Sequence, residues 1–413
     1  MKADLDRLMS ERGFDALLVT GASLNNPVMY YLANGATVGE GTTLLKKREE
    51  EPVLLVNLME RDEAAKSGLQ VVDIGKYDFR SLLREAEGNR LLAGIKYREA
   101  IFEDMGITGK VSLYGMNEHG RSLVFYNAFN AAQDKVQVVG EYTDTIFDTA
   151  WTTKDPEEVE RIRRVGEKTM NVVGNTAEFL QSHRASNGVL VKNDGSALTV
   201  ADVKREIRRW LMEENIEDPE GVIFSIGRDA GVGHSSGEDA DPIAVGKAIV
   251  YDIFPREAGG GYFFDFTRTW CMGHASPQIE KAYRDVMDTF ETLMSEMKMG
   301  DLCRVHEART CDLLEARGHV THRSNPRSHQ GYYHSLGHGI GLNVHERPFF
   351  GIFEGNEDTL APNSVVTIEP GLYYPDDGEF GIRIEDCVWM NPETGSFEAL
   401  ADFSKELVLP VKA

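Results

Sequence analysis

The sequence predicts a mixed α/β (α+β) chain built from two domains. Its 413 residues exceed what a single ordinary hydrophobic core organises. Short apolar runs alternate with helical patterns up to residue 150, whereas the later part combines amphipathic helices with strand-like runs interrupted by glycine. We therefore expect an α/β domain over residues 1–150 and a second domain over residues 151–413.

Composition excludes several classes of protein. The chain has 41% hydrophobic and 27% charged residues, which is typical of a globular protein, and no run approaches the roughly eighteen apolar residues of a membrane span. Its start, MKADLDRLMSERGF, lacks the apolar segment of a signal peptide. The net charge of −23 disfavours nucleic-acid binding, and the one basic cluster, KREIRR at 204–209, fits an exposed helix face. We expect a cytoplasmic protein without a nucleic-acid or membrane partner.

The cysteine pattern points to a reducing compartment. No pair among the four cysteines has C-x-x-C spacing, which argues against a disulfide scaffold or a thiolate zinc site. We expect all of them to be plain buried thiols: Cys271, Cys303, Cys311 and Cys387.

Within the first domain, the run ALLVT at 16–20 indicates a buried strand. In the segment TTLLKKREEEPVLLVN at 42–57, two strand-like runs flank a charged stretch, as in a β-hairpin. Another apolar pattern follows at 82–94. No cluster of catalytic residue types occurs here, so we expect the chemistry in the second domain.

Three amphipathic helices are predicted in the second domain. The first begins after Asp155, which can cap it, and Pro156 suits its first turn. The second covers ADVKREIRRWLM at 201–212. The third runs from Ser276 to Gly300, with apolar residues spaced three or four apart. The remainder of this domain is strand-like.

The segment HSLGHGIGLNVHERP at 334–348 places three histidines within twelve positions. Three glycines in it would each cost a helix about 1 kcal/mol relative to alanine, so extended or looped backbone is predicted. On a strand, residues four apart share a face and residues seven apart do not. A single metal that contacts His334, His338 and His345 together is therefore not expected, and other ligands must lie elsewhere.

A first predicted hairpin opposes two glutamates. In TIEPGLYYPDDGEFGIRIED at 367–386, the PDDG turn separates two strand-like runs. If the turn centres on Asp377, Glu369 lies opposite Glu385. Directly opposed like charges are destabilising, so one such coincidence alone would indicate a protonated pair or a slipped register.

A second predicted hairpin opposes two aspartates. In YDIFPREAGGGYFFDFTRT at 251–269, a turn centred between Ala258 and Gly259 places Asp252 opposite Asp265. Two such hairpins together favour cations over surface turn acids. Four carboxylates and a histidine offer an oxygen-rich site for two divalent ions about 3.5–4 Å apart, with manganese, cobalt, iron or zinc as candidates.

Four motifs, in order, resemble those of the pita-bread metallopeptidases. They are DFTRT at 265–269, the histidine segment at 334–348, IEPG at 368–371 and RIED at 383–386. The chain is most similar to the Xaa-Pro aminopeptidase and Xaa-Pro dipeptidase (prolidase) branch of the M24 peptidases. The resemblance runs from about residue 150 to the end, and the preceding part resembles the creatinase-type N-terminal domain. It implies a creatinase-like α/β domain followed by a pita-bread catalytic domain.

By position, the resemblance implies a site for two divalent metal ions per chain, with manganese preferred and cobalt, zinc or iron as alternatives. Of the three histidines, only the middle one is then a ligand. The implied metal ligands are Asp252, Asp265, His338, Glu369 and Glu385.

Four more residues are implied around the substrate. His334 and His345 resemble substrate-side histidines, His234 resembles a further active-site histidine, and Arg383 should face the same side as Glu385. The other histidines match no motif: His119, His183, His274, His306, His319, His322 and His329.

One departure from the family pattern concerns the groove beside Asp252. Phe254 stands where the family usually has glycine, and Pro255 cannot donate to a strand ladder. We expect the ligand role of Asp252 to survive this change, with an altered groove next to it.

The resemblance implies hydrolysis of an N-terminal Xaa-Pro bond in a peptide or dipeptide with proline in second position. Glu369 would carry the proton of the attacking water to the leaving nitrogen, and His345 or His234 would hydrogen-bond the developing oxyanion. A metal-dependent lyase or other non-peptidase hydrolase on the same fold is the alternative. A homodimer is expected from the resemblance alone.

Overall fold

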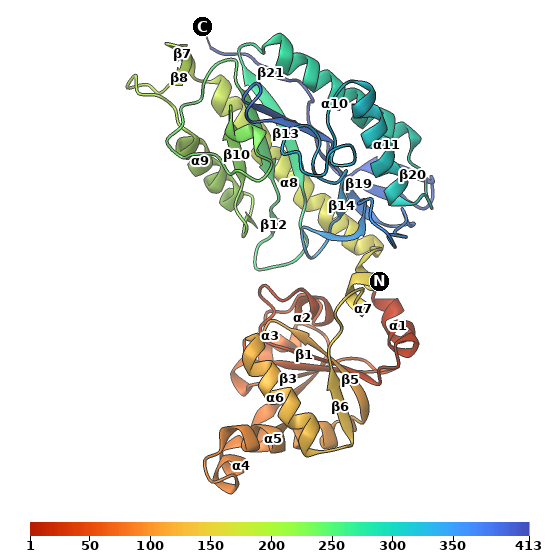
Figure 1. Cartoon of the computed structure of the whole chain (residues 1–413). Coiled ribbons are helices and arrows are strands. Elements are labelled where there is room, and N and C mark those ends of the chain that lie inside the picture. The colour runs from red at the N-terminus through yellow and green to blue at the C-terminus, as the bar shows by residue number, and fades with distance from the viewer. Residues whose placement is uncertain (413) are drawn as a thin grey trace. The chain divides into compact units, whose positions relative to one another are not determined.

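A six-stranded sheet organises the first part of the chain (Figure 1). Its strand order is β4-β3-β2-β1-β5-β6. β2 pairs antiparallel with both β1 and β3, so the predicted hairpin at 42–57 is confirmed, and the other pairs are parallel. The strands are β1 (Ala16–Thr20), β2 (Thr43–Lys47), β3 (Val53–Val56), β4 (Gln70–Asp73), β5 (Gly109–Gly115) and β6 (Val136–Val139).

Helices accompany this sheet and share its core. Leu18, Leu45 and Val111 from the strands pack in one buried cluster with Phe102 and Phe129 from the helices. The helices are α1 (Leu5–Glu11), α2 (Pro27–Leu32), α3 (Arg61–Ala65), α4 (Phe79–Glu85), α5 (Arg90–Asp104), α6 (His119–Ala132) and α7 (Ile146–Trp151), with 3-10 turns at Lys2–Asp4, Leu58–Glu60 and Ile74–Tyr77.

The computed structural model describes residues 1–412, which divide into two units. One unit comprises Met1–Ala150 with Gly259–Gly261, and the other comprises Trp151–Ala258 with Tyr262–Ala413. Over the described residues, none of the helices combines the length and hydrophobicity that a membrane crossing requires.

Four long helices flank the sheets of the second unit. Asp155 is the N-cap of α8 (Pro156–Gln181), as predicted, and within a capping box its backbone N–H donates to the Glu158 carboxylate at 2.6 Å. The third predicted helix, α10 (Pro277–Glu296), ends four residues before Gly300, since buried Met297 adopts extended backbone. The other two are α9 (Val200–Glu213) and α11 (Cys303–Ala316), and a 3-10 turn lies at Asp229–Gly231.

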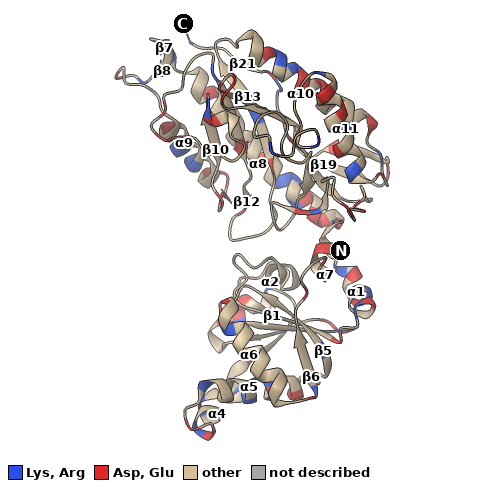
Figure 2. Ribbon diagram, viewed as in Figure 1, with Lys and Arg blue, Asp and Glu red and all other residues tan. Residues whose placement is uncertain are grey.

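The basic cluster lies on α9 (Figure 2), and it is mostly a solvated face, as predicted. Arg205, Arg208 and Arg209 are exposed, and Arg209 pairs with glutamates of its own helix. Lys204 is the exception, because it is buried and pairs with Asp239 at 3.2 Å. The prediction that Lys204 lies on an exposed helix face was wrong.

Two larger sheets carry most of the strands of the second unit. Their orders are β10-β11-β13-β21 and β15-β14-β16-β19-β20, and the pairs β12-β9, β17-β18 and β7-β8 form separate two-stranded sheets. The strands are β7 (Arg184–Ser186), β8 (Val189–Val191), β9 (Ile216–Glu217), β10 (Ile223–Ile226), β11 (Ala248–Ile253), β12 (Arg256–Glu257), β13 (Phe266–Met272), β14 (His338–Gly339), β15 (Glu346–Phe349), β16 (Val365–Ile368), β17 (Gly371–Tyr374), β18 (Phe380–Arg383), β19 (Asp386–Asn391), β20 (Ser396–Ala399) and β21 (Val408–Leu409).

The register predicted around Asp377 is confirmed on both sides of the two glutamates. Gly371 pairs with Arg383 in the β17–β18 ladder, and Ile368 pairs with Asp386 in the β16–β19 ladder. Both ladders share the register that sets Glu369 opposite Glu385. Between them the strands part, because the Glu369 N–H donates to the Leu336 carbonyl and the Glu385 N–H to the Thr267 carbonyl.

The register predicted for the second hairpin is wrong by two residues. Asp252 lies opposite Thr267, because the turn centres between Gly259 and Gly260 and not one residue earlier. These glycines have φ values of +86° and +103°, which favour glycine over any other residue. Asp265 precedes Thr267 by two, so in extended backbone it still shares the face of Asp252.

Glycine in the histidine segment is required by close packing and not by turns. A Cβ on Gly337 would overlap the Thr367 carbonyl oxygen, and one on Gly339 would overlap the carbonyl of Arg347. The backbone is extended or looped here, as predicted, and His338 lies between two points where neighbouring strands approach closely.

We predict that Gly339→Ala lowers the free energy of unfolding of the second unit by about 1–3 kcal/mol, the usual cost of overpacking. Gly174→Ala is the matched control. It lies inside α8 with only Phe403 at 3.8 Å from an added Cβ, so it should be neutral or stabilising by up to about 1 kcal/mol. All four tryptophans belong to the second unit, so denaturation followed by tryptophan fluorescence measures both effects. Equal stability of the two variants would contradict the packing argument.

Candidate metal centre

A cavity of about 1540 Å³ opens in the second unit. It is lined by segments that are distant in sequence, from α9 through β11 and the histidine segment to β18. All nine predicted site residues line it: His234, Asp252, Asp265, His334, His338, His345, Glu369, Arg383 and Glu385.

Three of the candidate ligands form a tight group. One ligand atom from each of Asp265, His338 and Glu385 lies within 4.8 Å of the other two. Glu369 joins this group, with its Oε1 3.3 Å from the His338 Nε2 atom, while Asp265 Oδ2 lies 3.8 Å from the same nitrogen. Each of these residues comes from the end of a strand or directly beside one, so four strands converge on one point.

His338 is oriented as a metal-binding histidine. Its Nδ1 lies 3.0 Å from the Gly339 carbonyl oxygen and can only donate there, which leaves Nε2 unprotonated toward the carboxylates. Its backbone N–H donates to the Thr367 hydroxyl at 3.1 Å.

Three buried carboxylate oxygens lack a hydrogen-bond partner within residues 1–412: Asp252 Oδ1, Asp265 Oδ1 and Glu385 Oε1. Burial, and then the neighbouring carboxylates, raise the pKa of Asp265 and of Glu385 well above their ordinary values. Burial likewise raises the pKa of Glu369 to about 8. Unpaired buried charge is costly, so these oxygens fit a site for divalent cations, which would compensate the charge and occupy the vacant acceptors.

Asp252 lies at the edge of this group because Arg383 binds it. The Arg383 guanidinium contacts Asp252 Oδ2 and donates to the Tyr373 hydroxyl at 2.6 Å. Its Nε donates to the Thr267 hydroxyl at 3.1 Å, and that hydroxyl donates to Glu385 at 2.7 Å. Arg383 and Glu385 therefore face the same side and are joined through Thr267.

His334 belongs to the same hydrogen-bond network. Its Nδ1 donates to the Ser335 carbonyl at 2.7 Å, so its Nε2 can accept from the Tyr373 hydroxyl at 3.0 Å. Burial, together with nearby Arg383, lowers the pKa of His334 to about 3. The histidine is neutral and lies 3.9 Å from the Glu369 carboxylate.

His345 lies closer to His338 than strand parity predicted. The two rings are 4.4 Å apart, because the chain leaves the strand after Gly339 and returns as β15, paired with β14. Burial, and then His338, lower the pKa of His345 to about 4. It stays outside the tight three-residue group, and His234 lines the cavity separately.

Sequence reasoning missed three residues that hold this network together. Thr267 connects Arg383 to Glu385, Tyr373 connects Arg383 to His334, and Thr367 contacts both His338 and Glu369. Thr267 and Thr367 each lie two positions from a predicted ligand, so strand periodicity was the available signal for them. Tyr373 pairs with Gly381 and had no such signal.

The residues of the second unit match a known family. The model of metallopeptidase family M24 matches residues 160–392. The protein named "Probable dipeptidase PepE" of Mycobacterium tuberculosis is 28% identical over 235 residues, which are 57% of this chain and 55% of that protein. The match therefore spans about half the length of that relative. The Xaa-Pro dipeptidase of Pyrococcus furiosus is 25% identical over 396 residues, 94% of this chain and 95% of that protein.

The fold agrees over nearly the whole chain. The crystal structure of X-Pro aminopeptidase from Thermotoga maritima superposes with a TM-score of 0.74 at 23% identity, covering 97% of this chain and 99% of that one. This confirms the predicted mixed α/β architecture with the pita-bread fold. Since the family model spans more than half of the sequence, the chain belongs to metallopeptidase family M24.

Proposed function

We propose that this chain is a dimetal hydrolase that cleaves the N-terminal Xaa-Pro bond of peptides, as an Xaa-Pro aminopeptidase or an Xaa-Pro dipeptidase. The observation that carries the proposal is the convergence of three buried carboxylates, the half-buried Glu369 and a histidine, with three unpartnered oxygens. The proline preference rests on the relatives named Xaa-Pro dipeptidase and X-Pro aminopeptidase. These relatives do not favour a lyase or a non-peptidase hydrolase.

The ligands we propose for two divalent ions are Asp252, Asp265, His338, Glu369 and Glu385. When bound, such ions supply positive charge that polarises the scissile carbonyl and acidifies the attacking water. Oxygen-rich donors suit manganese, and cobalt, zinc or iron are alternatives. Arg383, which contacts Asp252 and donates to Tyr373 and Thr267, would stand beside these ions.

Glu369 is the proposed proton carrier. Its backbone is fixed by the Leu336 carbonyl at 2.8 Å, and the Thr367 hydroxyl lies 3.4 Å from Oε1. It can accept the proton of the attacking water and deliver it to the leaving proline nitrogen. His334, 3.9 Å away, would help to position substrate beside it.

His345 and His234 are the proposed donors to the developing oxyanion. Both line the cavity, and the ring of His345 lies against that of the proposed ligand His338. A preorganised N–H aimed at the position where negative charge develops lowers the barrier.

We further propose a cytoplasmic homodimer whose N-terminal unit, residues 1–150, contributes to the interface. The four cysteines are free, which suits a reducing compartment.

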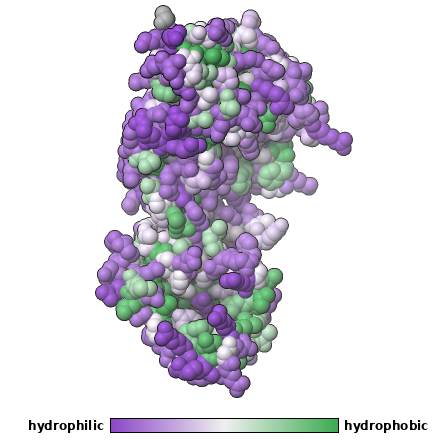
Figure 3. Space-filling view, turned by 90° about the vertical axis from the view of Figure 1, so that its left-hand side faces the viewer, coloured by the Kyte–Doolittle hydropathy of each residue, from purple (hydrophilic) through white to green (hydrophobic). Residues whose placement is uncertain are grey.

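The proposed dimer interface rests on exposed apolar side chains of the N-terminal unit, including Met59 at 89% and Leu123 at 65%. Figure 3 shows hydrophobic residues on the surface of this unit. Sedimentation showing a fully active monomer would refute the dimer.

Substrate choice tests the function directly. Metal-loaded protein should hydrolyse Xaa-Pro or Xaa-Pro-Yaa and lose most activity when alanine replaces the proline. Activity on the dipeptide alone identifies a dipeptidase, and activity on the tripeptide identifies an aminopeptidase. The matched pair of Ala-Pro and Ala-Pro-Ala, with Ala-Ala-Ala as control, separates these outcomes. Absence of hydrolysis of every proline substrate by metal-replete protein would overturn the proposal.

His338→Ala should lose metal, whereas His345→Ala should keep it. The wild type is expected to hold two ions per chain. Only His338 directs a free nitrogen into the carboxylate group, and loss of one oxyanion donor typically costs about 10²–10³-fold in kcat. Elemental analysis and kcat of both variants measure the difference. Equal metal loss in the two would contradict these assignments.

Glu369→Gln should retain much of the metal while kcat falls about 10²–10⁴-fold, the usual worth of general acid–base catalysis. Glutamine keeps an oxygen and nearly the same volume but cannot carry the proton. Metal content and kcat must be measured on the same preparation. Near-normal turnover of a metal-replete variant would mean that another group moves the proton.

A further inference from the structure

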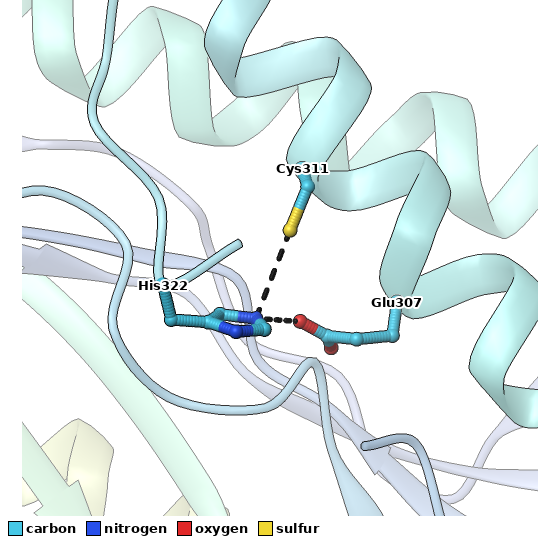
Figure 4. Close-up of side chains that lie close together, drawn as sticks. All are labelled: Glu307, Cys311 and His322. Carbon is cyan, nitrogen blue, oxygen red and sulfur yellow. Dashed lines mark hydrogen bonds and ion pairs between the residues drawn. The ribbon is translucent and has the colours of Figure 1, made fainter. Parts of the chain in front are cut away.

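Three chemically distinct side chains converge beside α11, away from the cavity described above (Figure 4). Glu307 and Cys311 are four residues apart on this helix and so share a face. His322, from the loop after the helix, places its Nε2 2.7 Å from Glu307 Oε1 and 3.7 Å from Cys311 Sγ. None of the three lines the large cavity.

The loop that carries His322 is held against α11 by its neighbours. Arg323 pairs with both Asp312 and Glu315 of the helix at 2.7 Å. The backbone N–H of His322 donates to the Tyr332 carbonyl at 2.7 Å. The imidazole is therefore positioned by contacts that do not depend on Glu307 or Cys311.

Hydrogen bonds hold one oxygen of the Glu307 carboxylate, and the other oxygen is left for the point where the three side chains meet. The residue is fully buried, and its Oε2 accepts from the Tyr332 hydroxyl at 2.9 Å and from the Leu336 N–H. Its Oε1 is the atom that faces His322. A buried carboxylate anchored in this way presents a preset ligand atom.

We propose that Glu307, Cys311 and His322 bind one divalent transition metal ion of the zinc class, at a site separate from the dimetal centre. Thiolate, imidazole nitrogen and carboxylate oxygen are the donors that zinc takes, and a thiolate with a carboxylate balances its charge of +2. Three protein ligands leave a fourth position, and the His322 side chain is 30% exposed, so water can reach it.

The distances fit such a site after a small adjustment. Bonds of about 2.0–2.3 Å to a tetrahedral zinc hold ligand atoms roughly 3.3–3.8 Å apart. The present separation of 3.7 Å between Cys311 and His322 already agrees, and that of 2.7 Å between His322 and Glu307 must widen. Binding would release the Cys311 thiol proton and the proton shared by His322 and Glu307 to solvent.

An ion here would join α11 to the proposed active site. Leu336 donates its N–H to Glu307, and its carbonyl accepts the N–H of Glu369 at 2.8 Å. Metal bound at the α11 site would therefore restrain the loop that precedes His338.

Cobalt(II) titration of the full chain tests the site. A thiolate ligand gives a sulfur-to-cobalt charge-transfer band in the near ultraviolet, whereas the proposed dimetal ligands contain no sulfur. Because the dimetal centre also takes cobalt, we expect this band to be complete after three equivalents per chain in the wild type and to vanish in Cys311→Ser. Cys303→Ser, a buried cysteine on the same helix, should retain it, and so should His338→Ala, which removes a ligand of the dimetal centre.

Absence of the band in wild-type protein, or its persistence in Cys311→Ser, would overturn the proposal. X-ray absorption at the zinc edge provides a test that needs no variant. Wild-type protein loaded with zinc should show a sulfur neighbour at about 2.3 Å, and a shell of nitrogen and oxygen alone would also overturn it. Because His338→Ala abolishes the proposed peptidase but not this signal, failure of one proposal is distinguishable from failure of the other.

Discussion

The crowding of four carboxylates, three buried and one half-buried, around a single arginine is the constraint on which the second unit depends. Arg383 neutralises Asp252, but Asp265, Glu369 and Glu385 lack a comparable cation among the described residues. Their raised pKa values indicate that charge repulsion and desolvation destabilise this arrangement in the folded chain. Ions that bind only the folded form offset this cost, so metal binding and the stability of the unit are thermodynamically linked.

The fold meets this constraint by ending strand pairing where the proposed ligands lie. Glu369 and Glu385 share a register but turn their backbone N–H groups to Leu336 and Thr267 instead of to each other. Every backbone donor at the gap is thereby satisfied, and the side chains enter the cavity from strand ends held by buried ladders. Glycine at 337 and 339 permits the close strand approach that aligns His338.

Much of this arrangement could be predicted from particular residues. PDDG fixes its turn tightly, so the register of Glu369 and Glu385 followed correctly. The AGGG run does not fix its turn in this way, because each of its three glycines tolerates positive φ. The turn therefore lies one residue later than predicted. Strand parity misplaced His345, since a loop reversal leaves no periodic signal. Cysteine spacing alone could not reveal Cys311 beside His322, because the partners are Glu307 on the same helix and a loop histidine.

The gap in this hairpin also separates two requirements that a continuous ladder would couple: the alignment of the two glutamates and the length of the turn. Pairing resumes beyond the gap in an unchanged register, and the tip at 376–379 is exposed. Residues can therefore be added to or removed from that tip while Glu369 and Glu385 stay opposite each other, since the β16–β19 ladder fixes their alignment from the other side of the gap. An architecture of this kind tolerates changes in the length of the periphery without a change in the inner geometry.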